Sequence, residues 1–369
     1  MNKVLNKKRG KTVAIVDGLI KTIYPICKLF ENKKRISLSD VKKILVINFG
    51  YLGDTLISFP AIESLRNAYP KSRIDLLINP KFKDIWKYNY DYDNLIEYDV
   101  PWIRYGFKLC LKDIINYFKK IKKIKKEKYD MVIDLRGDLR NIFLLVYKSK
   151  APIRAGYGIT GGDYLLTNSI KFPNLHEVEN NLALSKSLGG KKSEYELEIG
   201  KEEFKKIESL LNSIEKEIII ILPSAGYPTK EWEIEKWIEL VDKLNSKYQI
   251  ILAGAKGDKN ISSILKYAKT KPIEFTGKSL NEVGALMTKS KLVIGCDSGG
   301  MHLASIVGAK TIELMGPTDI NRWKAYKNCT VISKYESCSP CGLYNTCNQK
   351  LKRKCMKKIK VQEILNEVR

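Results

Sequence analysis

The sequence predicts an α/β protein built from two doubly wound domains, and three observations support this. A chain of 369 residues exceeds what one hydrophobic core usually organises. Continuous apolar segments of strand length alternate with amphipathic helical segments, as in parallel sheets covered on both faces. The alternation weakens once, between about residues 151 and 213, and then resumes. We therefore expect two facing Rossmann-like domains with a cleft between them, in which ligands bind at the carboxyl ends of the strands.

The first half contains the expected order of a doubly wound sheet. Apolar strands are predicted at 42–49, 73–79, 94–99 and 129–135, and helices at 54–68, 81–89 and 107–126. After the weaker region, strands are predicted at 216–223, 248–254, 291–297 and 310–316. Helices are predicted there at 231–247, 260–269, 280–290 and 301–308. The polar segment at 190–213 is the expected hinge.

The chain is strongly basic, with 66 Lys and Arg against 41 Asp and Glu and a formal net charge of +25. Such a charge favours anionic partners, which include nucleic acids, anionic membrane surfaces and phosphorylated substrates. Composition alone does not choose among them.

The N-terminal segment 12–30 is apolar but is interrupted by Asp17, Lys21 and Pro25, so no membrane-spanning helix is expected. A cleaved signal peptide is not expected either, because no small-residue cleavage site follows a compact apolar core. Basic residues flank the segment on both sides. Two interpretations stay open: an amphipathic helix on an anionic leaflet, and an ordinary packing helix.

The stretch FGYLGDTLISFPAIESLR, residues 49–66, places Asp54 at the start of a predicted helix. It follows a buried strand and a loop that contains Gly50 and Gly53. A carboxylate at this position either caps the helix or carries out chemistry at the strand end.

The second half carries polar residues at three strand ends. In IGCDSGGMHLASIVG, Asp297 ends a strand, and Ser298 and Gly299 lead into a helix that carries His302. Small residues at a helix N-terminus suit a diphosphate, although a simple turn capped by Ser298 has the same pattern. A dinucleotide-binding G-x-G-x-x-G is absent from this turn, which argues against a dehydrogenase.

Two further strand ends fit the same interpretation. Lys230 follows Ser224, Ala225 and Gly226 and could neutralise a phosphate, and Asp258 follows Gly254 and could accept ribose hydroxyls. Each is weak evidence alone, since solvated lysines are common in so basic a chain. Together the three strand ends describe a nucleotide-shaped site.

Six segments, in unbroken order over residues 41–320, resemble the signature blocks of the family 9 glycosyltransferases, the lipopolysaccharide heptosyltransferases. They are ILVINFGYLGDTLISFPAIESLRNAYP, YDMVIDLRGDLR, LPSAGYPTKEW, LAGAKGD, CDSGGMHLAS and ELMGPTD. The resemblance implies a GT-B fold and an inverting, metal-independent transfer of a sugar, with ADP-heptose as the expected donor. The implied acceptor is a lipid-linked lipopolysaccharide core or related surface glycan at the inner face of the cytoplasmic membrane, with the enzyme cytoplasmic and peripheral.

The resemblance also implies roles for residues and regions. Asp54 corresponds to the catalytic base, with Gly50 and Gly53 near the acceptor and donor sugar. The donor site is implied at Lys230, Asp258, Asp297, Ser298, Gly299 and His302, and at Ala225 and Gly226. Relatives often carry hydroxyl residues in place of Ala225 and Gly226, so another nucleotide sugar stays open as donor. The implied regions are a basic N-terminal extension at 1–40, an acceptor domain at 41–195 and a donor domain at 196–369.

Four cysteines crowd into the C-terminal segment: Cys338, Cys341, Cys347 and Cys355. No cofactor is expected for catalysis, but four thiolates can hold a structural zinc ion or an iron–sulfur cluster. Disulfides and free thiols are the alternatives that the spacing leaves open.

The helix predicted at 107–126 carries lysines over most of its surface, either as a solvated face or as a surface for an anionic leaflet. No aromatic platform or recognition-helix pattern supports nucleic-acid binding, so no nucleic acid is expected as a partner. The alternative functions are a non-catalytic basic membrane- or nucleic-acid-binding protein on the same fold, and a sugar-nucleotide 2-epimerase.

Overall fold

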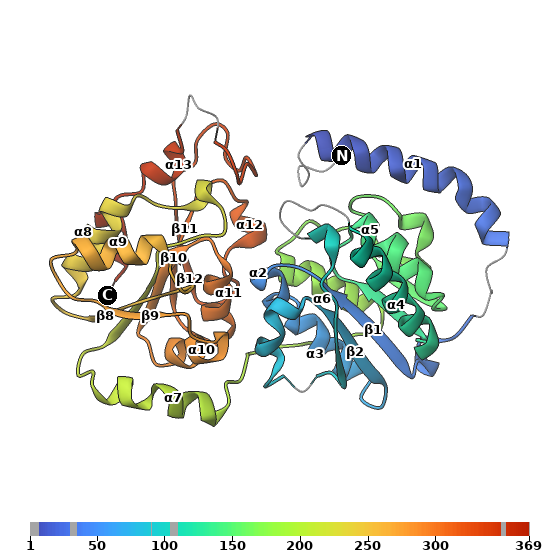
Figure 1. Ribbon diagram of the computed structural model, residues 1–369, viewed down its shortest axis with the longest axis horizontal. Helices are drawn as coiled ribbons and strands as arrows, with labels where there is room; N and C mark the ends of the chain where they lie inside the picture. Colours follow the sequence, from blue (N-terminus) through green and yellow to red (C-terminus); the bar gives the residue numbers. More distant parts are fainter. Residues whose placement is uncertain (1–6, 30–34, 90, 104–109, 348–351, 369) are drawn as a thin grey trace. The chain divides into compact units, whose positions relative to one another are not determined.

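In the computed structural model, the chain forms two compact units (Figure 1). The structure describes residues 7–29, 35–89, 91–103, 110–347 and 352–368. Unit 1 comprises the described residues of 1–83 and 89–195, and unit 2 comprises 84–88 and 196–368. The predicted α/β fold class is confirmed, since each unit is a parallel sheet with helices on its faces.

Unit 1 is organised around a six-stranded sheet with the order β3-β2-β1-β4-β5-β6. Its strands are β1 (Lys43–Asn48), β2 (Arg73–Ile78), β3 (Asn94–Glu97), β4 (Met131–Asp134), β5 (Ile153–Gly156) and β6 (Asn168–Ser169). The pairs are parallel, and β1 aligns Ile44 with Met131 and Ile47 with Asp134 of β4. Because β1 is buried from Ile44 onward, its continuous apolar run reflects cover on both faces.

The helices of unit 1 are α1 (Lys7–Leu29), α2 (Leu52–Leu56), α3 (Phe59–Ala68), α4 (Leu111–Glu127), α5 (Leu139–Asn141) and α6 (Glu177–Ser187). They lie between these strands in the sequence, except α1, which precedes β1, and α6, which follows β6. A π-helical turn, η4 (Ile142–Val146), and a 3-10 turn, η5 (Tyr147–Ser149), continue α5. Further 3-10 turns are η1 (Leu38–Asp40), η3 (Pro101–Ile103), η6 (Asp163–Leu165) and η2 (Pro80–Trp86), the last of which continues into unit 2.

Two predictions for unit 1 were wrong in detail. The helix predicted at 54–68 begins earlier and is broken into α2 and α3, because Ser58 precedes the new helix start and Pro60 stands in its first turn. The helix predicted at 81–89 is the 3-10 segment η2. The first residues of the helix predicted at 107–126 lie outside the described residues, and α4 begins at Leu111.

Unit 2 contains a second six-stranded parallel sheet with the order β12-β11-β10-β7-β8-β9. Its strands are β7 (Ile218–Leu222), β8 (Gln249–Gly254), β9 (Ile273–Thr276), β10 (Leu292–Cys296), β11 (Thr311–Met315) and β12 (Cys329–Ser333). Counted within each unit, both sheets have the strand order 3-2-1-4-5-6. In both, the order reverses between the first and fourth strands, which is where doubly wound sheets bind ligands.

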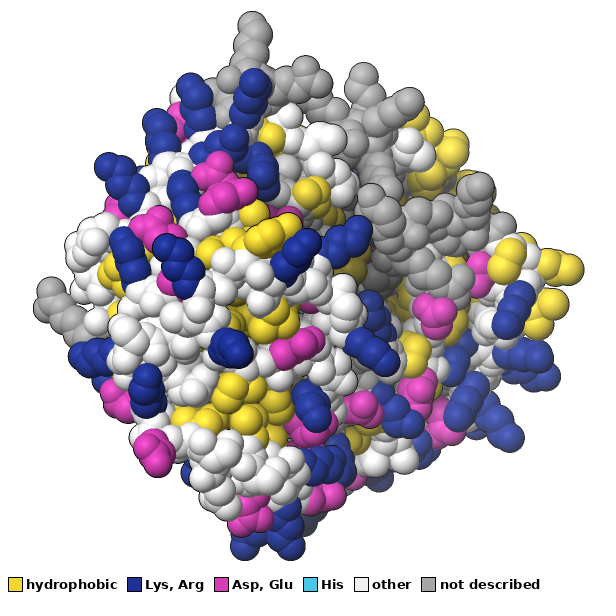
Figure 2. Space-filling model, turned by 60° about the vertical axis from the view of Figure 1, so that its left-hand side comes forward, with side chains coloured by type: hydrophobic (Ala, Val, Ile, Leu, Met, Phe, Trp, Pro, Cys, Tyr) yellow, Lys and Arg dark blue, Asp and Glu magenta, His cyan; other side chains and the backbone are white. Residues whose placement is uncertain are grey.

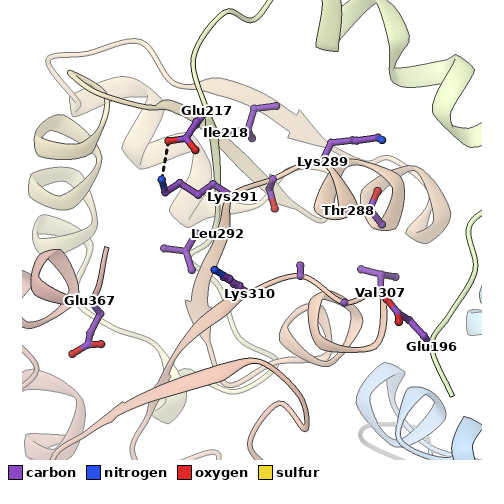
Figure 3. A pocket seen from close by; sticks show the side chains of 13 residues that line it. Glu196, Glu217, Ile218, Thr288, Lys289, Lys291, Leu292, Val307, Lys310 and Glu367 are labelled. Carbon is purple, nitrogen blue, oxygen red and sulfur yellow. Dashed lines mark hydrogen bonds and ion pairs between the residues drawn. The ribbon is translucent and has the colours of Figure 1, made fainter. Parts of the chain in front are cut away.

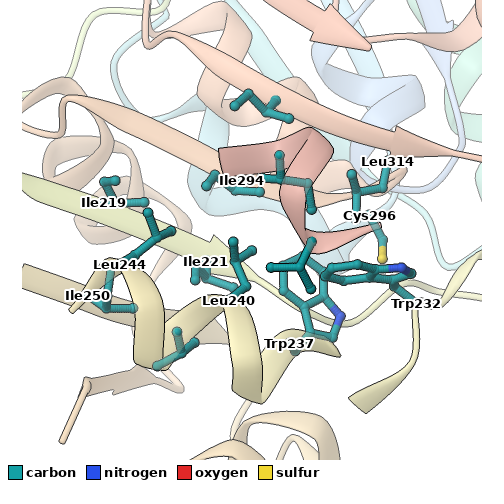
Figure 4. Packing of buried hydrophobic residues seen from close by; sticks show 14 of the residues in the cluster. Ile219, Ile221, Trp232, Trp237, Leu240, Leu244, Ile250, Ile294, Cys296 and Leu314 are labelled. Atoms are coloured by element: carbon teal, nitrogen blue, oxygen red, sulfur yellow. The ribbon is translucent and has the colours of Figure 1, made fainter. Parts of the chain in front are cut away.

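The helices of unit 2 cover both faces of this sheet. They are α7 (Lys201–Asn212), α8 (Ile234–Leu244), α9 (Lys259–Tyr267), α10 (Leu280–Thr288), α11 (Gly299–Ile306), α12 (Ile320–Trp323), α13 (Lys354–Lys357) and α14 (Val361–Glu367), with the 3-10 turn η7 (Pro228–Lys230). Figure 4 shows the core on one face, where Trp237 and Leu240 of α8 pack against Ile219, Ile221 and Ile294 of the strands.

The sequence interpretation missed four strands, β5, β6, β9 and β12, which extend both sheets beyond the predicted elements. The segment 190–213 was expected to be a hinge, yet residues 201–212 of it form α7, which packs against α10 inside unit 2. The boundary between the units lies near Tyr195.

Two surface properties bear on the partner classes. In Figure 2, the Lys and Arg side chains on the visible face are interspersed with Asp and Glu. Among the described residues, no helix has both the length and the hydropathy that crossing a membrane would require.

Candidate functional site

Asp54 lies in unit 1, on α2 just beyond the carboxyl end of β1. It is the third residue of α2, and its Oδ2 accepts a hydrogen bond of 2.9 Å from the backbone N–H of Tyr51 in a capping-box arrangement. Its side chain is 17% exposed. The helix therefore fixes the carboxylate at the strand end, so the capping interpretation is correct but incomplete.

The same oxygen of Asp54 also forms an ion pair with Arg136, with 2.7 Å between Oδ2 and Nη1. Arg136 follows β4, the neighbour of β1, so the pair stands at the reversal point of the unit 1 sheet. Burial opposes the charge on Arg136, but Asp54 outweighs it and raises the pKa of the guanidinium. The guanidinium is therefore a cation at neutral pH.

Gly50 makes this ion pair possible. A Cβ on Gly50 would lie 2.4 Å from Arg136 Nη1 and 2.4 Å from Asp54 Cβ, both closer than real Cβ contacts. Gly53 does not belong to the loop, as the sequence suggested, but lies inside α2, where its carbonyl accepts the N–H of Ile57. The space that Gly50 provides is thus occupied by the ion pair itself.

Asp134 shapes the turn that carries Arg136. Its Oδ2 accepts hydrogen bonds from the backbone N–H groups of Gly137 and Asp138 at 2.8 and 3.2 Å, and its Oδ1 accepts one from Asn141 at 3.0 Å. Burial raises the pKa of Asp134 to about 7. Asp134 is therefore a positioning residue for Arg136.

Lys230 and Asp297 come together in unit 2. Lys230 Nζ lies 2.8 Å from Asp297 Oδ2, and the two side chains are 14% and 5% exposed. Lys230 belongs to the turn after β7 and Asp297 follows β10, which is the neighbour of β7. This second ion pair also stands at the reversal point of its sheet.

A buried acid that the sequence interpretation did not identify lies beside this pair. Glu313 of β11 is fully buried, and its Oε2 accepts the backbone N–H of Ala325 at 2.7 Å. Burial and then the nearby Asp297 carboxylate raise the pKa of Glu313 to about 8. Glu313 is consequently neutral at pH 7 and does not offset the charge of Lys230.

The turn after Asp297 leads into α11, which begins at Gly299, two residues before the predicted start at 301. Ser298 occupies the N-cap position, but its side chain makes no capping hydrogen bond, so the simple capping interpretation does not account for it. His302 lies on α11 and is 7% exposed. The N-terminus of α11 is thus close to the Lys230–Asp297 pair, because only Ser298 separates Asp297 from the first residue of the helix.

The remaining predicted donor residues have different environments. Asp258 caps α9: its Oδ1 accepts hydrogen bonds from the N–H groups of Asn260 and Ile261 and from the hydroxyl of Ser224 at 2.7 Å. This capping role was not foreseen. Ala225 packs partly against the core, and a Cβ on Gly226 would meet nothing within 4 Å.

The cysteine-rich segment reaches the Lys230 turn through Tyr344. The Tyr344 ring stacks on Tyr227 at 5.2 Å between centroids, and Lys230 Nζ lies 4.9 Å above the same ring. The hydroxyl of Thr229 donates to the Tyr344 carbonyl at 2.7 Å. Burial raises the pKa of Tyr344 to about 12, so its hydroxyl remains neutral.

The four clustered cysteines form no disulfide in the structure, and three of them are half-buried while Cys355 is buried. Burial raises the pKa of Cys355, and the neighbouring Cys341, Cys338 and Cys347 raise it further. The backbone N–H of Arg353 donates to Cys347 Sγ at 3.2 Å. No group of three or more His, Cys, Asp or Glu side chains among the described residues is arranged to bind a metal ion.

A cavity of about 1000 Å³ lies at the opposite edge of the unit 2 sheet (Figure 3). It is lined at the amino ends of β7 and β10 by charged side chains, among them Lys289, Lys310 and a Glu217–Lys291 ion pair of 2.8 Å. The lining contains none of the residues predicted for the site. We do not assign the donor to it, because doubly wound sheets bind ligands at the carboxyl ends of their strands.

Arg136, Glu313 and Tyr344 are the residues that sequence reasoning missed. Arg136 directly follows a predicted strand, so its position at a strand end was a usable signal. The only signal for Glu313 was an acidic residue inside a strand that was otherwise predicted to be apolar and buried. Tyr344 gave no signal, because its contact with Lys230 joins distant parts of the chain.

Comparisons with known proteins identify the family and the fold of the chain. The profile of glycosyltransferase family 9 (heptosyltransferase) matches residues 117–352. Lipopolysaccharide heptosyltransferase 3 of Escherichia coli K12 is 28% identical over 293 residues, which are 75% of this chain and 83% of the relative.

Two solved structures have the same fold. E. coli ADP-heptose lps heptosyltransferase II matches with a TM-score of 0.71 and 20% identity, over 88% of this chain and 97% of that one. The iron-containing dodecameric glycosyltransferase TibC from enterotoxigenic E. coli H10407 matches with a TM-score of 0.56 and 15% identity, over 90% of this chain and 77% of that one. The fold is therefore GT-B, and the chain belongs to glycosyltransferase family 9, the heptosyltransferase family.

Proposed function

We propose that the protein is an inverting glycosyltransferase that moves a heptose from ADP-heptose to a lipid-linked lipopolysaccharide core or related surface glycan. The observation that carries the proposal is the Asp54 carboxylate, held by Tyr51 and Arg136 at the carboxyl end of β1 in a member of this family. The proposal requires that the edges of both sheets act on the same pair of substrates.

Asp54 is the proposed general base. Among the described residues, the hydrogen bonds of its side chain go to Oδ2, so Oδ1 is the oxygen that we expect to receive the proton. As the acceptor O–H bond breaks, the acceptor oxygen bonds to the anomeric carbon on the face opposite the diphosphate. The bond from the anomeric carbon to the phosphate oxygen breaks with its electron pair, which inverts the configuration.

Lys230 is the proposed cation for the leaving diphosphate. Its ammonium pairs with Asp297 in the structure, and the neighbouring N-terminus of α11 adds N–H groups from Gly299 and Gly300. Donors fixed where negative charge develops lower the barrier without needing a divalent ion. We therefore expect transfer to persist in EDTA.

The names of the relatives support the proposed substrates. The E. coli K12 relative is a lipopolysaccharide heptosyltransferase, and the first of the two structures is named for ADP-heptose and lps. A different nucleotide sugar is the second candidate for the donor. Ala225 and Gly226 have no hydroxyl groups to bind the donor, and the space beside Gly226 is open to a different group. A screen of ADP-, UDP- and GDP-sugars by ligand-induced thermal shift, followed by a transfer assay, separates the two. Transfer from a UDP- or GDP-sugar alone would refute the ADP-heptose assignment.

The four clustered cysteines are a proposed structural metal site. The proposal rests on the chemistry of four thiols, which suits zinc or iron, although the described side chains are not arranged around a metal ion in the structure. TibC, which has the same fold, is an iron-containing enzyme, and this supports the same proposal. Metal analysis of anaerobically purified protein tests it, and four titratable thiols with no bound metal would refute it.

A lipid-linked acceptor places the proposed enzyme at the inner face of the cytoplasmic membrane as a peripheral protein. The high net charge supports attraction to an anionic leaflet. Fractionation of cells that express the protein tests this location, and recovery in the soluble fraction at low salt would contradict it.

A further inference from the structure

Helices α1 and α4 of unit 1 expose more large apolar side chains than the rest of the described surface, and the proposed chemistry uses none of them. On α1 they are Ile15, Val16, Leu19, Ile23, Ile26 and Leu29, and on α4 they are Leu111, Ile114, Ile115 and Phe118. Contiguous exposed apolar patches of this kind mark interaction surfaces.

The apolar face of α1 is turned away from the protein. Leu19, Ile23 and Ile26 are 62%, 57% and 62% exposed, and their spacing of four and three residues aligns them on one side of the helix. The half-buried positions Val13 and Ile20 follow the same spacing on the other side. α1 therefore presents two faces, of which only one contacts unit 1.

Polar and aromatic contacts hold the packing face of α1. Asp17 Oδ1 accepts hydrogen bonds from the Gly162 N–H at 2.9 Å and from the Tyr164 hydroxyl at 3.1 Å. Tyr24 packs against Tyr147 and Tyr164, with ring centroids 6.0 and 5.4 Å apart. These contacts account for Asp17 within an apolar segment, and they fix the direction of the opposite face.

The patch on α4 adjoins the same part of unit 1. Leu111 and Phe118 are 72% and 62% exposed, and the Tyr117 hydroxyl donates to the Leu144 carbonyl at 3.0 Å. Leu144 belongs to η4, and η5, which directly follows, carries the Tyr147 that contacts α1. Both helices thus contact one helical segment, 142–149, through side chains outside their exposed apolar faces.

Lysines surround both patches. Lys21 and Lys28 are exposed on α1, and the exposed lysines of α4 include Lys112, Lys119 and Lys122. Apolar side chains among lysines match an anionic bilayer, which takes the apolar groups at its acyl boundary and the ammonium groups at its headgroups. A nucleic acid would leave the apolar groups unused, and a second copy of the chain would bring like charges together.

We propose that the exposed faces of α1 and α4 form one surface, here called the α1–α4 face, that inserts shallowly into an anionic membrane. The loop that holds α1 is also tied to the turn of Arg136, because Thr160 N–H donates to the Gly137 carbonyl and Leu139 N–H donates to Thr160 Oγ1. This step rests on the proposed function: the surface would bring the carboxyl end of the unit 1 sheet, where Asp54 lies, to a lipid-linked acceptor.

Co-sedimentation of the full chain with phosphatidylethanolamine–phosphatidylglycerol vesicles tests the proposal. We expect the Leu19→Ser/Ile23→Ser variant to partition at least about tenfold less than wild type, because apolar burial is lost. Wild-type binding should persist in part at high salt, since salt does not screen the apolar contribution. Leu175→Ser, an equally simple change at a 52% exposed site of unit 1, should bind as wild type does.

Equal vesicle binding by wild type and the double variant overturns the proposal. A change of oligomeric state in the double variant without vesicles also overturns it, because the face would then belong to a second copy. If the double variant fails to fold, Phe118→Ser on α4 decides by the same measurement. Transfer to a lipid-free acceptor should be unchanged in folded variants. Vesicle binding without any wild-type transfer would refute the proposed function and leave the α1–α4 face intact.

Discussion

The two units have the same strand order and carry an ion pair at the same topological position, but the charges are exchanged. In unit 1 the acid Asp54 follows the first strand and the cation Arg136 follows the fourth. In unit 2 the cation Lys230 follows the first strand and the acid Asp297 follows the fourth. The same backbone arrangement therefore holds an acid after the first strand of one unit and a cation after the first strand of the other, as the proposed base and the proposed anion site require.

The largest effect is expected from replacing the acid of the unit 1 ion pair. We expect Asp54→Asn to lower turnover by at least about 100-fold, the low end of general-base contributions, because the amide cannot accept the proton. Donor affinity, measured by calorimetry, should stay close to wild type since the proposed donor residues lie in unit 2. Near-normal transfer by this variant would remove Asp54 from the mechanism.

The second largest effect is expected from removing the cation of the unit 2 ion pair. Lys230→Ala removes the cation and leaves Asp297 buried without its ion-pair partner, so we expect donor affinity to fall by about 10- to 100-fold. Lys310→Ala is the matched control, because Lys310 lines the cavity at the opposite edge of the same sheet. Equal losses of donor affinity in the two variants would mean that the donor does not depend on the Lys230 edge.

A third prediction compares the glycines that follow the first strand of each unit. Gly50→Ala should lower the free energy of unfolding by about 1–3 kcal/mol, because the new Cβ collides with Asp54 and Arg136. Gly226→Ala should leave it nearly unchanged, because a Cβ there meets nothing within 4 Å. Denaturant unfolding of both variants measures the difference. Similar stability would show that the Asp54–Arg136 pair tolerates displacement.

The smallest expected effect is a pH dependence of donor affinity in unit 2. Since the pKa of Glu313 is raised to about 8, this acid is neutral below that pH and becomes an anion near Lys230 above it. Affinity for the proposed donor should therefore weaken by about 3- to 10-fold as pH rises through 8, because the new negative charge offsets the attraction of Lys230 for the diphosphate. Glu313→Gln should flatten this dependence, and an identical pH profile in that variant would exclude Glu313 as its source.

The sequence was sufficient for the central strands and their ends, because long apolar runs such as 218–222 leave little choice of structure. It was insufficient for short outer strands such as β6 and β9, whose formation depends on a neighbouring strand rather than on local pattern. Asp54 was identified from its block of residues. Its partner Arg136 was not, because the pairing requires β1 and β4 to be neighbours in the sheet although they lie far apart in the sequence.

The Asp17 contact has a consequence for synthesis of the chain. The ribosome makes Asp17 145 residues before Gly162, whose N–H it binds. Until that loop has emerged, α1 lacks this packing surface, and most of the stability of a helix in a protein comes from such packing. We expect the nascent segment to be unfolded at first and to become helical either when unit 1 is complete or on an early encounter with lipid. The order in which these events occur would decide whether the enzyme folds in solution or beside the membrane.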